Sequence, residues 1–183
     1  MCIRDSYIKA RRYNNVILCG HSMGGAIAQM YALRYPDELK GLILIGTGAK
    51  LKVDQNWIAG LRNAENSETE WVDSQKGFFS GVEPDLYQLL VQRSAQIGPD
   101  VGLNDLLCCD KFDVLSEIDR ISLPTEIISG SLDKLTPVKF SEYLASKIEN
   151  SEDYVVEGGD HFMQLQYHKE VNGRIERFIQ RVK

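Results

Sequence analysis

Short apolar runs alternate with helical stretches along most of this chain, and this alternation is the feature that most restricts its fold. Each run is centred on apolar residues and is followed by glycine within two residues; the runs are Val16–Cys19, Leu42–Ile45, Glu126–Ser129 and Tyr154–Val156. Such runs are typical of buried strands in a parallel sheet with helices on its faces. The sequence therefore predicts an α/β fold with a mainly parallel sheet and flanking helices.

The stretches that follow these runs carry apolar residues at helical spacing. The first predicted helix follows Gly24 and is interrupted at Pro36. Thr136 is predicted to cap a helix whose first residue is Pro137. The final helix places on one face the residues Val171, Ile175, Phe178, Ile179 and Val182.

About eighty residues, 46–123, separate the second run from the third, which is too long for a simple crossover loop. We predict that residues 50–118 form a helical cap insertion over the C-terminal edge of the sheet, where open α/β folds bind ligands. Its aromatic residues either form a small core of the insertion, which we favour, or line a ligand site; they are Trp57, Trp71, Phe78, Phe79 and Tyr87. The α/β domain is predicted to span residues 13–183.

Composition excludes several classes of function. The net charge is −5 and the isoelectric point about 5.3, so no basic surplus is present to neutralise a nucleic acid, and no such partner is expected. The longest apolar runs are a few residues, against roughly 20 for a bilayer span, so no membrane span is expected. The four cysteines show no C-x-x-C spacing, and neither a metal site nor a disulfide is predicted.

A G-x-S-x-G motif lies between the first strand and the first helix, at Gly20, His21, Ser22, Met23 and Gly24. A serine in a strained strand-to-helix turn is the nucleophile elbow, which exposes the hydroxyl oxygen at the edge of the sheet. The flanking glycines are expected because a side chain in such a crowded turn would clash. The Met23 amide, directly after the serine, is predicted to donate one hydrogen bond in an oxyanion hole.

A serine hydroxyl needs a base within hydrogen-bond reach and an acid to orient that base. Of the three histidines, His161 follows the fourth strand on a loop that can reach the elbow, and we predict that it is the base. His21 is interpreted as a packing or supporting residue beside the nucleophile. His168 lies in a polar stretch and is interpreted as a surface residue.

The acid is predicted to be Asp133, which follows the third strand at the same edge of the sheet as Ser22 and His161. The three then occur in the chain order Ser, Asp, His. Asp160 is a weaker alternative because it is the sequence neighbour of the histidine and its side chain faces elsewhere.

Four segments resemble the alpha/beta-hydrolase family of esterase-like serine hydrolases: GHSMGG, GLILIGTGA, the stretch from CDKFDVL to LPTEIISGSLDKLTP, and GGDHFMQLQ. The resemblance implies a triad, mapped onto Ser22, Asp133 and His161, an acyl-enzyme intermediate and no cofactor. Relatives commonly carry glutamate and proline after the histidine segment, where this chain has Gln166 and His168.

The same resemblance implies an N-terminal half of the sheet, including a loop that donates the second oxyanion hydrogen bond, which we expect to be missing here. Residues 1–12 are interpreted as a partial or non-native segment, since MCIRDS looks foreign to the rest and lacks the apolar stretch of a signal peptide. We expect the chain alone to be poorly active and prone to aggregate, and a cytoplasmic location.

These features predict a serine hydrolase that acts on a small carboxylic ester or related acyl substrate. Two alternatives share the site: hydrolysis of carbon–carbon bonds or cofactor-free peroxidation by the same triad, and a small-ligand receptor or inactive homologue that only binds.

Overall fold

The computed structural model describes residues 7–8, 10–13, 15–64, 71, 79 and 81–182. Its sheet has four strands in the order β1-β2-β3-β4, each parallel to its neighbour. This confirms the predicted parallel sheet. The strands span β1 (Val16–His21), β2 (Leu39–Ile45), β3 (Thr125–Gly130) and β4 (Ser151–Val156).

Two of the strands begin three residues earlier than predicted, and β3 begins one residue earlier. β2 starts at Leu39 and β4 at Ser151, although polar residues such as Lys40 and Glu152 follow these starts. Both extensions pair with a neighbouring strand, since Val16 is aligned with Leu39 and Thr125 with Ser151. Backbone pairing therefore extends the strands past the apolar pattern that marks their centres.

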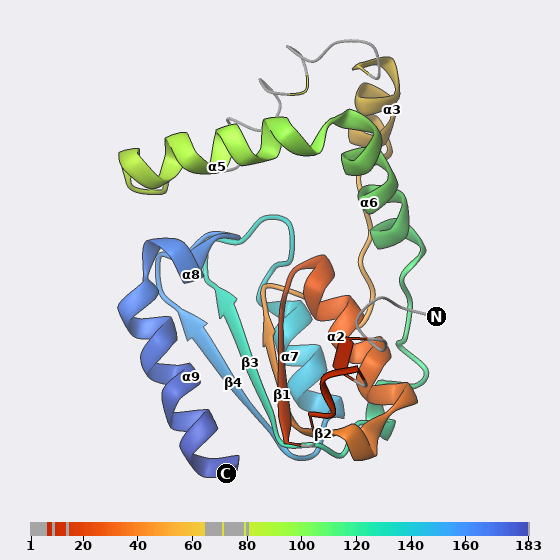
Figure 1. Cartoon of the computed structure of the whole chain (residues 1–183), viewed down its shortest axis with the longest axis vertical. Helices are drawn as coiled ribbons and strands as arrows, with labels where there is room; N and C mark the ends of the chain where they lie inside the picture. The colour runs from red at the N-terminus through yellow and green to blue at the C-terminus, as the bar shows by residue number, and fades with distance from the viewer. Residues whose placement is uncertain are drawn as a thin grey trace.

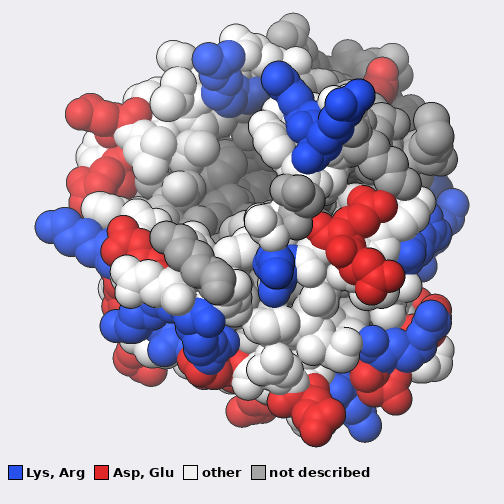
Figure 2. Space-filling model, turned by 60° about the horizontal axis from the view of Figure 1, so that its bottom comes forward, with Lys and Arg blue, Asp and Glu red and all other residues white. Residues whose placement is uncertain are grey.

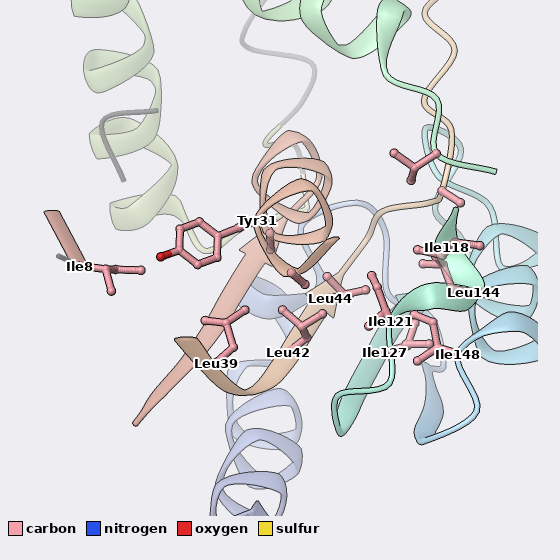
Figure 3. Packing of buried hydrophobic residues seen from close by; sticks show 14 residues of the cluster. Ile8, Tyr31, Leu39, Leu42, Leu44, Ile118, Ile121, Ile127, Leu144 and Ile148 are labelled. Atoms are coloured by element: carbon pink, nitrogen blue, oxygen red, sulfur yellow. The ribbon is translucent and has the colours of Figure 1, made fainter. Parts of the chain in front are cut away.

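Alternate residues of the central strands face two separate layers of helix. Leu42, Leu44 and Ile127 pack with α2 (Met23–Arg34) and α7 (Lys139–Lys147), as Figure 3 shows for the larger cluster. On the other face, Ile43 and Ile45 pack with residues of α9 (His168–Val182). The central strands are thus buried on both faces, as their continuous apolar sequence indicates.

The predicted start of α7 is wrong by two residues. Its first residue is Lys139 and its N-cap Val138, whereas Pro137 lies outside the helix. The Thr136 hydroxyl donates to the Asp133 carboxylate instead of capping the helix. The described chain also contains the short helical elements η1 (Pro36–Glu38), η3 (Ile118–Arg120) and α8 (Met163–Gln166).

The segment between β2 and β3 is mainly helical where the structure describes it. It contains α3 (Gln55–Ala64), α5 (Pro84–Ile97) and α6 (Pro99–Lys111), which lie beyond the arrowheads of the strands in Figure 1. A separate apolar cluster joins α3 and α6 through Val53, Ile58, Leu61, Trp71 and Leu103. Trp71 therefore belongs to a small core of the insertion, as predicted, although it also borders a cavity together with Trp57 and Phe79. Phe78 lies outside the described residues.

A buried carboxylate in β3 links the sheet to α9. Glu126 is 1% exposed, and the Arg174 guanidinium of α9 donates to its Oε1 through Nε at 2.7 Å and contacts it through Nη2 at 2.5 Å. A carboxylate this deep in a protein requires such a partner. The pair therefore fixes how α9 lies on the sheet.

The surface carries charges of both signs. Figure 2 shows Lys and Arg side chains interspersed with Asp and Glu side chains over one face, as the modest net charge of −5 leads one to expect. None of the helices in the described part of the chain combines the length and the apolar character needed to cross a membrane.

Candidate active site

The predicted site residues follow three different strands at the same edge of the sheet. Ser22 comes directly after β1, Asp133 three residues after β3 and His161 five residues after β4. Parallel strands bring their carboxyl ends together, and the insertion helices lie over this edge (Figure 1). The topology thus places all three side chains below the cap.

Ser22 has the strained backbone of a nucleophile elbow. Its φ is 52° and its ψ −120°, a conformation that is rare for a residue with a side chain. The Ser22 amide donates to the Ile45 carbonyl at 2.9 Å, and the Thr47 hydroxyl donates to the Ser22 carbonyl at 2.9 Å. Although Ser22 is the N-cap of α2, its side chain makes no capping bond, so the hydroxyl is available for chemistry.

The glycines around Ser22 differ in how much they are needed. A Cβ at Gly20 would lie 2.2 Å from the Gly24 carbonyl oxygen, and one at Gly25 would lie 2.5 Å from the Thr47 side chain. Beyond its chain neighbours and its own helix backbone, a Cβ at Gly24 would meet no atom of the described chain within 4 Å. The prediction of crowding is therefore confirmed for Gly20 and wrong for Gly24; Gly25, outside the five-residue motif, is the second glycine that packing requires.

Asp133 and His161 form a buried pair. The Nδ1 atom of His161 lies 2.8 Å from Oδ2 of Asp133, and the two residues are 8% and 5% exposed. Because the ionised carboxylate only accepts, Nδ1 carries the hydrogen and Nε2 is left as the basic nitrogen. This is the tautomer that a general base next to a serine requires.

Three further hydrogen bonds hold the Asp133 carboxylate. Its Oδ1 accepts from the amides of Leu135 at 2.8 Å and Thr136 at 2.9 Å, and its Oδ2 accepts from the Thr136 hydroxyl at 2.7 Å. Burial by itself raises the pKa of Asp133, but the bonds from His161 and Thr136 outweigh it and lower the pKa below its ordinary value. The acid is therefore ionised at neutral pH. The sequence predicts a helix cap for Thr136 and gives no sign of this contact with Asp133.

His21 supports the loop of the base. Its Nε2 lies 2.7 Å from the His161 carbonyl oxygen, which can only accept, so Nε2 carries a hydrogen. The ring also packs against His161, with 4.7 Å between centroids, and against Phe162. Burial, followed by repulsion from His161, lowers the pKa of His21 to about 4. It is thus neutral at pH 7 and packs as predicted.

The remaining candidates have partners or positions other than contact with the His161 ring. Asp160 directs its carboxylate to the Phe162 amide and to Gln166, and His168 begins α9 in an exposed position. Cys109 borders the cavity, where burial raises the pKa of its thiol to about 11, whereas Cys108 is exposed. Among the described residues no cluster of His, Cys, Asp or Glu is arranged to hold a metal ion.

A cavity of about 770 Å³ brings the site together. Ser22 and His161 lie in its wall, but within the described chain no hydrogen bond joins the serine hydroxyl to the imidazole; such bonds often tighten only when substrate is bound. Met23 begins α2, so its amide is one of those that the helix leaves without an intrahelical acceptor. The insertion contributes a mainly apolar wall with Trp57, Leu61, Trp71, Phe79, Ile97 and Leu106.

The chain is similar to known proteins in sequence and in fold. The sequence matches the family described as alpha/beta hydrolase fold over residues 10–166. The 3-oxoadipate enol-lactonase 2 of Acinetobacter baylyi is 27% identical over 175 residues, covering 89% of this chain and 63% of the lactonase. A pimeloyl-[acyl-carrier protein] methyl ester esterase of Neisseria meningitidis is 26% identical over 159 residues, covering 79% of this chain and 61% of the esterase. Among solved structures, a thermophilic esterase has a TM-score of 0.79 and 34% identity, covering 97% of this chain and 70% of that one.

A parallel sheet with a strained serine turn at its carboxyl edge defines the class of α/β proteins with a nucleophile elbow. With the match over residues 10–166, the chain belongs to the alpha/beta hydrolase family. It spans 63% and 61% of the lengths of the lactonase and the methyl ester esterase.

The lowered pKa of His21 predicts a pH-dependent stability. The unfolded chain takes up a proton near pH 6.5, whereas folded His21 does so only near pH 4, so acidification through this window favours unfolding. From pH 7.5 to pH 5 this residue should remove up to about 2 kcal/mol of folding free energy. Urea unfolding measures this loss as the difference in free energy of unfolding between pH 7.5 and pH 5. In His21→Gln the loss should be smaller than in the wild type by that amount. His168→Gln, on the exposed start of α9, should lose as much as the wild type; an equal loss in His21→Gln would contradict the assignment.

Proposed function

We propose that this protein is a serine hydrolase that cleaves small carboxylic esters through an acyl-enzyme intermediate. The proposal rests on one observation above the others: the buried Asp133–His161 pair, 2.8 Å apart, lies at the same cavity as the strained Ser22. A histidine with its basic Nε2 free and a serine with a strained backbone are the groups that nucleophilic catalysis needs.

The mechanism follows from the roles of these groups. His161 Nε2 removes the hydroxyl proton of Ser22 as the oxygen attacks the acyl carbonyl, and ionised Asp133 stabilises the imidazolium that forms. The Met23 amide donates to the oxygen on which negative charge develops. His161 then protonates the departing alcohol, and a water molecule, deprotonated by the same histidine, releases the acid from Ser22.

Ester hydrolysis is favoured among the reactions of this triad by the relatives. Their names describe an enol-lactonase, a methyl ester esterase and a thermophilic esterase, and a lactone is a cyclic ester. The apolar cap wall, with Trp57, Phe79 and Leu106, suits the hydrocarbon part of such a substrate. A receptor that only binds would have no use for the strain at Ser22, which costs of the order of 1–3 kcal/mol.

The direct test is covalent labelling of Ser22 with a fluorophosphonate, together with hydrolysis of p-nitrophenyl butyrate. Wild type should label and turn over, and Ser22→Ala should do neither while keeping its unfolding temperature. The chain is assayed alone and extended with the N-terminal segment of the thermophilic esterase, because it spans 63% and 61% of the lengths of the two curated relatives. A folded, extended protein that neither labels nor turns over would support the binding alternative.

Thr136 provides a second prediction, because its hydroxyl donates to the catalytic carboxylate. Thr136→Val removes one hydrogen bond to Asp133, and kcat/KM for p-nitrophenyl butyrate should fall about tenfold. Thr136→Ser keeps the donor and should remain within a factor of about three. Wild-type activity in the valine variant would show that the carboxylate is held without this hydroxyl.

A further inference from the structure

We propose that Gln166 is a positioning residue, which acts through Asp160 to hold the loop that carries the base His161. The inference rests on the proposed function, since it assigns a role in the same reaction. Asp160 directly precedes His161, and Gln166 ends α8, six residues after Asp160.

Asp160 and Gln166 bind each other in both directions. The Gln166 side-chain amide donates from Nε2 to Oδ2 of Asp160 at 2.7 Å, and its Oε1 accepts from the Asp160 backbone amide at 3.2 Å. The second carboxylate oxygen, Oδ1, accepts from the Phe162 amide at 2.7 Å. The pair thus closes a hydrogen-bonded ring around the segment that contains His161.

Bonds from other elements hold the backbone on either side of this pair. The Gly159 carbonyl accepts from the Leu132 amide at 2.8 Å, which ties the loop to the segment carrying the acid Asp133. The His161 carbonyl accepts from His21 Nε2 at 2.7 Å. Within the loop, the Asp160 carbonyl accepts from the Met163 amide at 3.1 Å, and the Asp160–Gln166 ring adds a side-chain restraint on the peptides on either side of His161.

The polarity of the ring requires an amide at position 166. Oδ2 of Asp160 is an acceptor and needs a donor, which the Gln166 Nε2 supplies. A glutamate would place a second acceptor and a like charge against this carboxylate. An acceptor side chain at position 160 therefore requires a donor at position 166. A donor at position 160 with an acceptor at position 166 should form the same ring.

The cap packs onto this ring. A Cβ at Gly81 would lie 2.0 Å from Gln166 Nε2 and 3.3 Å from Oδ2 of Asp160, so the cap backbone lies directly against the pair. The Phe79 and Phe162 rings pack beside it, with 4.9 Å between their centroids. Shielding from water strengthens the bonds and makes a mismatched partner costly.

The test compares Gln166→Glu with the polarity exchange Asp160→Asn/Gln166→Glu, in which an asparagine amide donates to the new carboxylate. In Gln166→Glu, kcat per fluorophosphonate-titrated site should fall tenfold or more, with KM changed less than about twofold. The exchanged pair should recover to within about threefold of wild type. Gln180→Glu, which adds the same charge at an exposed position of α9, is the matched control and should keep wild-type kcat.

Two results would overturn the inference: wild-type kcat per titrated site in Gln166→Glu, or an exchanged pair as slow as the single variant. Its failure is distinct from failure of the proposed function, because the latter appears already as a wild-type protein that neither labels nor hydrolyses esters. A fall in total activity matched by an equal fall in titrated sites is the first of these results, since it would report lost folded protein.

Discussion

The buried carboxylate of Asp133 is the group on which the geometry of the site depends. A charge in this position is tolerated only if each oxygen finds donors, and here the loop after β3 supplies them through Leu135 and Thr136. The donor from outside that loop is His161, whose own loop follows β4. Satisfying one carboxylate thus joins two loops that are distant in sequence and sets the tautomer of the base.

Strain at Ser22 is the second constraint, and its surroundings are built to sustain it. The end of β2 accepts the Ser22 amide at Ile45 and donates to the Ser22 carbonyl from Thr47. The approach of the Gly20 Cα to the Gly24 carbonyl leaves no room for a Cβ. The strain at the end of the edge strand β1 is therefore balanced by hydrogen bonds to the end of β2 and to Thr47 and by close packing of the backbone.

The cap adds to this arrangement in two ways. Its apolar side chains form a wall of the cavity above Ser22, and its backbone at Gly81 packs on the Asp160–Gln166 pair beside the base. A substrate that fills the cavity therefore contacts the same insertion that covers the loop of His161. Substrate binding and the positioning of His161 therefore involve the same part of the protein.

The sequence predicts what depends on local pattern. The strand centres and the elbow follow from apolar runs and glycines, and the positions of Asp133 and His161 follow from parallel topology, because strand ends meet at one edge. The start of α7, the open space at Gly24 and the role of Thr136 could not be predicted in this way. Each depends on which atoms of a folded loop come within bonding distance. The burial of Glu126 could not be predicted either, because the sequence pattern shows only a polar residue in a strand.

The most direct test of the central claim, that Ser22 and the Asp133–His161 pair act as a covalent catalyst, is to trap the acyl-enzyme. The protein is mixed with p-nitrophenyl butyrate, quenched in acid within milliseconds and digested, and the peptides are identified by mass spectrometry. The account predicts a butyryl group on Ser22, absent in Ser22→Ala and formed much more slowly in Asp133→Asn. Turnover without an adduct on Ser22, or an adduct on Cys109 at the wall of the same cavity, would contradict it.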